Sequence, residues 1–216
     1  MRPAIVLCMM LLTFTACKRV QTEHWPNGNL KSTVAMRGDS YDGPASWYFE
    51  DGTLQMECTY RNNLLEGRLA RYYTTGMKKE EVYYRGNKAD SLYRFWDVAG
   101  NLLVEAAYRD SLLDGKFLEF YPGGKLKTEG WYKNGMYDGK WFWYNEDELI
   151  AGTAEYSAGE GIQKAFYPDG TLQQVIRFRN NLKDGAEEYY DRKGELVEIR
   201  YYRNGDLAEI KNIKKN

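Results

Sequence analysis

The chain has 216 residues, a formal net charge of −1, and an aromatic content of 15% that includes 19 Tyr and 6 Trp. A net charge this close to zero gives no general reason to bind nucleic acid or an anionic membrane surface. Because 21 Gly but only 5 Pro accompany the aromatic residues, the composition favours strands joined by tight turns over a helical protein.

The first residues differ in character from the rest of the chain. Arg2 precedes a short apolar run, residues 4–12, and small residues follow as far as Cys17. This arrangement is typical of a secretory signal, and the run is too short to span a bilayer comfortably. The stretch Phe14-Thr15-Ala16-Cys17 resembles a bacterial lipobox, although Leu is usual where Phe14 stands. We predict a signal peptide over residues 1–16 and a lipidated Cys17; the alternative is an ordinary signal peptide with an incidental Cys.

Acyl chains on Cys17 would hold a soluble domain to a membrane without a transmembrane helix. Lys18 and Arg19 follow, and by resemblance to known sorting signals the lack of Asp there favours the outer membrane. No acidic cluster of the kind linked to surface export follows either. We therefore predict an outer-membrane lipoprotein of the bacterial cell envelope that faces the periplasm. Residues 17–24 would be the lipidated Cys and a short tether, which carries the single histidine, His24.

From residue 25 onward the chain repeats with a period of 24 residues. Glu148 replaces one turn glycine, and two residues are missing from the sixth unit around residues 157–160. A second glycine, or Ser91 in one unit, follows the first by 15 residues wherever the unit is complete. The first series of turn glycines is Gly28, Gly52, Gly76, Gly100, Gly124, Gly170 and Gly194.

Columns of similar residues run through the repeats. The apolar residues of the first segment stand two, six and eight positions after the first glycine, and even offsets share one face of a strand. The odd offsets carry acids such as Glu57 and Glu81, which suit a solvated face. Five positions after the second glycine every unit has an aromatic residue: Tyr48, Tyr72, Trp96, Phe120, Tyr144, Phe166 and Tyr190.

Each unit therefore reads as strand, loop, strand and tight turn. Such units stack so that each contacts only its neighbours. The predicted fold is all-β: an elongated single-layer antiparallel sheet of tandem β-hairpin repeats over residues 25–216, with seven units and a partial eighth.

These residues carry a resemblance to a known family. The stretches 121–129, Tyr-Pro-Gly-Gly-Lys-Leu-Lys-Thr-Glu, and 132–140, Tyr-Lys-Asn-Gly-Met-Tyr-Asp-Gly-Lys, are similar to the MORN repeat variant. The resemblance covers residues 25–207 and implies a rod-like or gently curved sheet of hairpins. Bacterial members are often labelled antitoxin components of toxin–antitoxin systems.

The sequence offers little that would support catalysis. Cys58 falls in a column of small apolar residues, which predicts a buried, inert thiol. The recurring Asp residues before the second glycine are interpreted as turn formers, and the basic column from Arg37 to Arg203 as a self-neutralising solvated ladder rather than an anion-binding stripe. No phosphate loop or metal-binding motif is present. We predict no enzyme activity, no metal and no cofactor.

An aromatic surplus marks the middle of the repeat array. Phe117, Trp131, Trp141 and Trp143 are predicted as a binding patch. The three Trp are expected on the face opposite the tyrosine column, which stands eight positions after the first glycine, or straddling both faces. The alternative is extra packing within a twisted sheet. The leading functional hypothesis is an envelope-anchored scaffold for a protein or peptide. An antitoxin- or immunity-like inhibitor of one toxin and a glycan-binding module are the alternatives.

Overall fold

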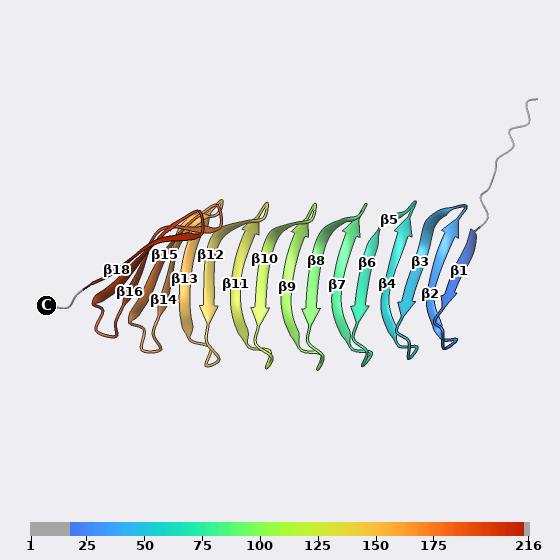
Figure 1. Cartoon of the computed structure of the whole chain (residues 1–216), viewed down its shortest axis with the longest axis horizontal. Coiled ribbons are helices and arrows are strands. Elements are labelled where there is room, and N and C mark those ends of the chain that lie inside the picture. The colour runs from blue at the N-terminus through green and yellow to red at the C-terminus, as the bar shows by residue number, and fades with distance from the viewer. Residues whose placement is uncertain (1–17, 214–216) are drawn as a thin grey trace, which may run out of the picture.

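The computed structural model describes residues 18–213, and it shows them as one antiparallel sheet of 18 strands that contains no helix (Figure 1). The strands stand side by side in chain order from one end of the molecule to the other (Figure 1). Consecutive strands pair antiparallel throughout, except that the two-residue β5 and the following β6 both pair with β4. The predicted single-layer hairpin array is confirmed. The predicted signal peptide and Cys17 lie outside the described residues.

The strands have the following bounds. They are β1 (Lys18–His24), β2 (Leu30–Arg37), β3 (Ser40–Tyr48), β4 (Leu54–Arg61), β5 (Leu64–Leu65), β6 (Gly67–Tyr72), β7 (Lys78–Arg85), β8 (Lys88–Trp96), β9 (Leu102–Arg109), β10 (Leu112–Phe120), β11 (Leu126–Lys133), β12 (Met136–Tyr144), β13 (Ile150–Ser157), β14 (Glu160–Phe166), β15 (Leu172–Arg179), β16 (Leu182–Tyr190), β17 (Leu196–Arg203) and β18 (Asp206–Asn212).

The segment predicted as a tether is a strand. Residues 18–24 form β1, which pairs with β2 from Lys18 opposite Arg37 to His24 opposite Leu30. The tether prediction is wrong for these residues because β2 offers a row of backbone groups that a further strand satisfies. Every residue of β1 is nevertheless exposed, His24 included, so β1 adds backbone pairing rather than core.

The two faces of the sheet carry different side chains. One face, here called the tyrosine face, bears the small apolar column at offset six and the tyrosine column at offset eight. The other, the carboxylate face, bears Glu57, Glu81, Glu105 and Glu129 together with the aromatic column of the second strands. Alternation along each strand produces this division.

Offset two does not follow this alternation. The register shifts where each second strand ends, as between Trp47 and Tyr48 opposite Leu54. At the equivalent position of its unit, Lys78 reaches Glu81 on the carboxylate face, with Nζ 2.9 Å from Oε2. A bulge of one extra residue reverses which side the chain presents. The prediction that offsets two, six and eight share a face is therefore wrong for offset two.

The hairpin loops at one edge of the strands bond to each other from unit to unit. Asn87, at φ 67°, lies in the loop of its unit. Its backbone N–H donates to the carbonyl of Leu65 one unit earlier at 3.0 Å, and its Oδ1 accepts from the N–H of Leu65 at 2.6 Å. Asn63 makes the same side-chain bond to Tyr41, and Ser111 to Ala89. These bonds hold the loops in the register of the strands.

We expect Asn87→Ala to lower the free energy of unfolding by about 1–2 kcal/mol, because it removes a hydrogen bond and because Ala adopts positive φ less readily than Asn. Asn87→Gly loses the same hydrogen bond, but glycine adopts positive φ without strain. The decrease in the free energy of unfolding should therefore be smaller. Urea unfolding of both variants measures the two effects. An Asn87→Ala protein as stable as wild type would contradict the loop bonding described here.

Candidate functional site

The tyrosine face holds two separate apolar clusters. The first is aliphatic and lies over β2–β8, with Val34, Ala45, Cys58, Leu69 and Val82 buried. The second is aromatic and lies over β10–β15, with Trp141 and Tyr156 buried and Phe117, Tyr132 and Phe178 packed against them. No second layer covers either cluster within the described chain, so side chains of neighbouring strands bury one another laterally.

Trp141 is the centre of the aromatic cluster, and only 2% of its surface is exposed. Its ring stacks on Phe117 with centroids 5.8 Å apart and meets Tyr132 edge-on at 5.0 Å. The indole N–H donates to the carbonyl of Trp131 at 3.1 Å. The ring lies directly over Gly130, where an added Cβ would stand 2.0 Å from Cδ2 of Trp141. Gly130 therefore leaves the space that this ring occupies.

The predicted binding patch is not one surface. Trp141 and Trp143 stack on each other on the tyrosine face, with centroids 5.9 Å apart, and Phe117 packs with them. Trp131 instead lies on the carboxylate face and is 52% exposed. Of the two arrangements predicted for the three Trp, a common face opposite the tyrosine column is wrong for Trp141 and Trp143, whereas a division between the two faces agrees with the structure. Trp141 and Trp143 pack in the core, where the glycine at offset six leaves space. Of the three Trp, only Trp131 remains available to bind a partner.

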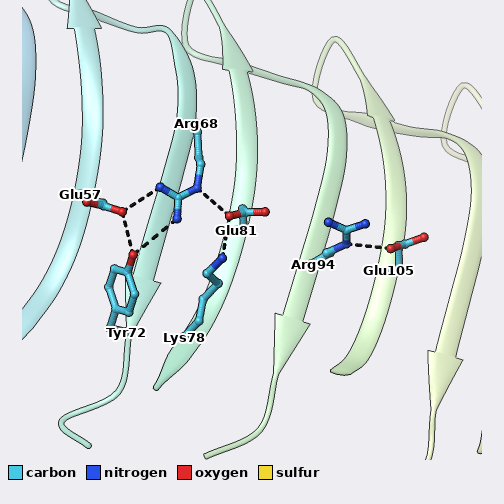
Figure 2. Close-up of polar contacts among 7 residues, drawn as sticks. All are labelled: Glu57, Arg68, Tyr72, Lys78, Glu81, Arg94 and Glu105. Carbon is cyan, nitrogen blue, oxygen red and sulfur yellow. Dashed lines mark hydrogen bonds and ion pairs between the residues drawn. The ribbon is translucent and has the colours of Figure 1, made fainter. Parts of the chain in front are cut away.

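The carboxylate face is more ordered than a solvated face. Glu57 accepts hydrogen bonds from Arg68 Nη1 at 2.8 Å and from the Tyr72 hydroxyl at 2.7 Å (Figure 2). The same guanidinium also contacts Glu81 on the next strand, with Nε 2.6 Å from Oε2. Lys78 donates a second hydrogen bond to that carboxylate (Figure 2). Glu81 is only 7% exposed. One arginine thus ties together β4, β6 and β7.

These contacts shift the titration of the carboxylates. The hydrogen bond from Tyr72, reinforced by Arg68, holds the pKa of Glu57 below its ordinary value. Burial works to raise the pKa of Glu81, but the hydrogen bonds from Arg68 and Lys78 outweigh it, so that pKa is also lowered. Burial and the bond to Glu57 raise the pKa of Tyr72. Both acids are therefore held in the ionised form.

The network recurs along the face with other partners. Arg94 Nε lies 2.8 Å from Glu105 Oε2 (Figure 2), and the Tyr144 hydroxyl donates to Glu129 at 2.8 Å. The in-phase columns of Glu and aromatic residues were the sequence signal for these bonds. Which Arg or Lys meets them could not be predicted, because Arg68 stands one position after the second glycine of its unit and Arg94 three positions after Ser91, which replaces that glycine.

The ladder of ion pairs on the carboxylate face is interrupted over β12–β14 and resumes on β15 and β16, where Arg177 Nη1 lies 3.0 Å from Glu188 Oε1. Thr153 on β13 takes the position that Glu holds in four earlier units, and a hollow of about 680 Å³ opens over β12–β14. Lys140 and Lys164 flank this hollow, and no described acid lies within ion-pair distance of either ammonium group. Its lining also includes Phe142, Thr153, Glu155 and Ile162.

The remaining polar columns have structural partners. Four of the seven residues of the basic column pair with the turn acids inside their own hairpins, as for Arg37 with Asp42 at 2.7 Å and Arg179 with Asp184 at 3.1 Å, which agrees with a self-neutralising ladder in those units. Cys58 is 5% exposed, and burial raises the pKa of its thiol, as expected for an inert cysteine. Residues 18–213 contain no group of three His, Cys, Asp or Glu side chains that could hold a metal ion. They also form no helix that could cross a bilayer.

Comparison with family models finds the MORN repeat variant at residues 41–62, 113–134, 159–180 and 183–204. The chain carries MORN repeat variants. Each match spans the second strand of one unit, the tight turn and the first strand of the next, as β3 and β4 do in the first match. The MORN repeat thus coincides with the strand pair joined by the tight turn rather than by the hairpin loop. No curated protein matches the chain.

We expect Trp141→Ala to lower the free energy of unfolding by about 3–5 kcal/mol, because it empties the aromatic cluster. Gly130→Ala should cost about 1–3 kcal/mol, because the new Cβ displaces a ring that its neighbours hold on all sides. Trp131→Ala, one residue from Gly130 but exposed, is the matched control and should stay within about 0.5 kcal/mol of wild type. Equal losses for Trp131→Ala and Trp141→Ala would contradict the assignment of faces.

The lowered pKa values of Glu57 and Glu81 predict a loss of stability in acid. Their contribution is complete above the ordinary carboxyl pKa of 4.5 and disappears as the pH falls through the folded-state values. The double variant Glu57→Gln/Glu81→Gln should be less stable at pH 7 by about 1–2 kcal/mol, after discounting for solvent screening at the half-exposed Glu57. Its thermal stability should also fall less steeply from pH 6 to pH 3 than that of wild type. Glu146→Gln, at an exposed carboxylate, is the control; parallel curves for wild type and the double variant would refute the network.

Proposed function

We propose that this MORN-repeat protein is an envelope-anchored, non-enzymatic scaffold that binds a protein or peptide on one face of its sheet. A repeat β-sheet of this kind suits protein interaction in general, because it presents a long, rigid surface with regularly spaced side chains. The single observation that carries the proposal is the exposed Trp131 on the carboxylate face, next to the strands over which the ion-pair ladder is interrupted.

The two faces differ in what they leave free for a partner. On the tyrosine face the large rings of the aromatic cluster are used in packing. On the carboxylate face Trp131 is 52% exposed and Ile162 is 46% exposed, and both are held in rigid strands rather than in loops. An exposed tryptophan beside a hollow is the kind of anchor that dominates binding energy at interfaces.

A lipid anchor at Cys17, predicted from the sequence, is the basis for the proposed envelope location. Strand β1 begins at Lys18, directly after that cysteine. Acylation of Cys17 would therefore hold the β1 end of the sheet at the membrane surface, with the outer membrane and the periplasmic side as the proposed location. The remaining units would extend away from that point and keep the region around Trp131 clear of the lipid.

An antitoxin- or immunity-like inhibitor would use the same surface for one tight partner. The glycan-binding alternative depended on several exposed Trp rings near the middle of the array. Trp141 is not available for stacking because it is buried. The scaffold is therefore the better supported proposal.

Affinity capture from chemically cross-linked envelopes tests the proposal. Wild type should fractionate with membranes and capture a defined set of proteins, and Cys17→Ala should release the chain from the membrane. Trp131→Ala should lose the captured set, while Tyr83→Ala, which removes an exposed ring from the same column of the same face, should retain it. Capture unchanged by Trp131→Ala would refute this face as the binding surface, and a single tightly held toxin would identify the inhibitor instead.

A further inference from the structure

We propose that the hollow over β12–β14 binds an extended acidic peptide segment of a partner protein, seating an apolar side chain between Lys140 and Lys164. This inference rests on the proposed function and names the chemistry of the partner. It is carried by a difference within the carboxylate face: Arg68 and Arg94 of earlier units are paired with acids, whereas Lys140 and Lys164, in the corresponding columns, have no described acid within ion-pair distance.

The earlier units set the comparison. Arg68 is satisfied by Glu57 and Glu81, and Arg94 by Glu105, so that each guanidinium has an acid of its own face within 2.8 Å (Figure 2). Both guanidinium groups are therefore already neutralised by acids of their own face. A charged partner would have to break these pairs in order to bind there.

The hollow lacks those acids. Thr153 stands directly opposite Lys164 in the position of the missing glutamate. The single acid of the lining is Glu155, which lies opposite Lys140 in the register but outside ion-pair distance of it. Both lysines are exposed, so two ammonium groups face one carboxylate across the opening.

Other acids of this region are committed elsewhere. Glu129 accepts the Tyr144 hydroxyl, and Asp138 accepts the backbone N–H of Ala158 at 3.3 Å. The local balance around the opening therefore favours an anionic ligand, although the whole chain is nearly neutral. Charge complementarity of this kind selects partners and sets the rate of association.

The floor of the hollow explains why a peptide fits better than a membrane surface. Phe142 is half-buried and Ile162 is 46% exposed, and both line the space between the lysines. A recess of about 680 Å³ accommodates a large apolar side chain, whereas lipid headgroups need a broad basic surface. Lys140 on β12 and Lys164 on β14 are two strand spacings apart, roughly 10 Å, which an extended peptide spans with about three residues.

Selection from a displayed library of random linear peptides, with the full mature chain as the target, tests the inference. The selected peptides should be enriched in Asp and Glu flanking an aromatic or aliphatic residue. Their affinity should fall about tenfold in Lys140→Gln/Lys164→Gln, and it should weaken as salt is raised. Lys133→Gln/Lys193→Gln, which changes the charge equally at exposed sites outside the hollow, is the control and should bind as wild type does.

Three results would overturn the inference. Selected peptides that bind equally to the Lys140→Gln/Lys164→Gln variant would place the site elsewhere and leave the scaffold proposal standing. Failure to select any peptide would count against both proposals. Binding of vesicles containing anionic phospholipid through the same two lysines, with no acidic peptide bound, would replace the peptide with a membrane. Unchanged thermal unfolding of the double variant establishes that it is folded.

Discussion

The rest of the structure depends on one constraint: a single-layer sheet has no second layer to cover its side chains. Burial must come from neighbours on the same face, one strand spacing away, and this makes a repeating sequence necessary. The tyrosine face shows how the constraint is met. From Val82 through Ala106 to Gly130 the residue at offset six becomes smaller, and its hairpin neighbours on the second strands are the rings of Tyr93, Phe117 and Trp141. A small residue at offset six thus leaves room for the large ring beside it, in place of the interdigitation of two layers.

The carboxylate face meets the same constraint with polar groups. Acids such as Glu81 are nearly covered by side chains of their own face, and a covered carboxylate is stable only when it is bonded. Arg68, Lys78 and Tyr72 supply those bonds, so this face acts as a second, polar core. A substitution that removes one member, such as Thr at position 153, changes both the packing and the charge. The hollow over β12–β14 therefore combines an apolar floor with free cations.

Much of the fold could be predicted from the sequence, because each repeat carries its own turn glycines and aromatic columns. The hairpin order, the placement of offsets five and six on opposite faces and the buried Cys58 follow from the period alone. Features that depend on register could not be predicted. The bulge that moves Lys78 to the carboxylate face leaves no mark in the 24-residue spacing. The placement of Trp131 and Trp141 on opposite faces depends on the space at Gly130, which the run of aromatic residues in the sequence does not reveal. Strand β1 was missed because it lies before the first glycine and buries nothing.

The central claim is that the two faces have different roles: the tyrosine face stabilises the sheet, and the carboxylate face over β12–β14 binds the partner. Ile162 and Gln163 are consecutive residues of β14 that point to opposite faces, opposite Glu155 and Ala154 respectively. A photo-reactive amino acid placed at each position in turn, in intact cells, probes the two faces separately from nearly the same point on the sheet. The account predicts cross-links to a partner protein from position 162 and none from position 163. Cross-links from position 163 alone, or equally from both, would contradict it.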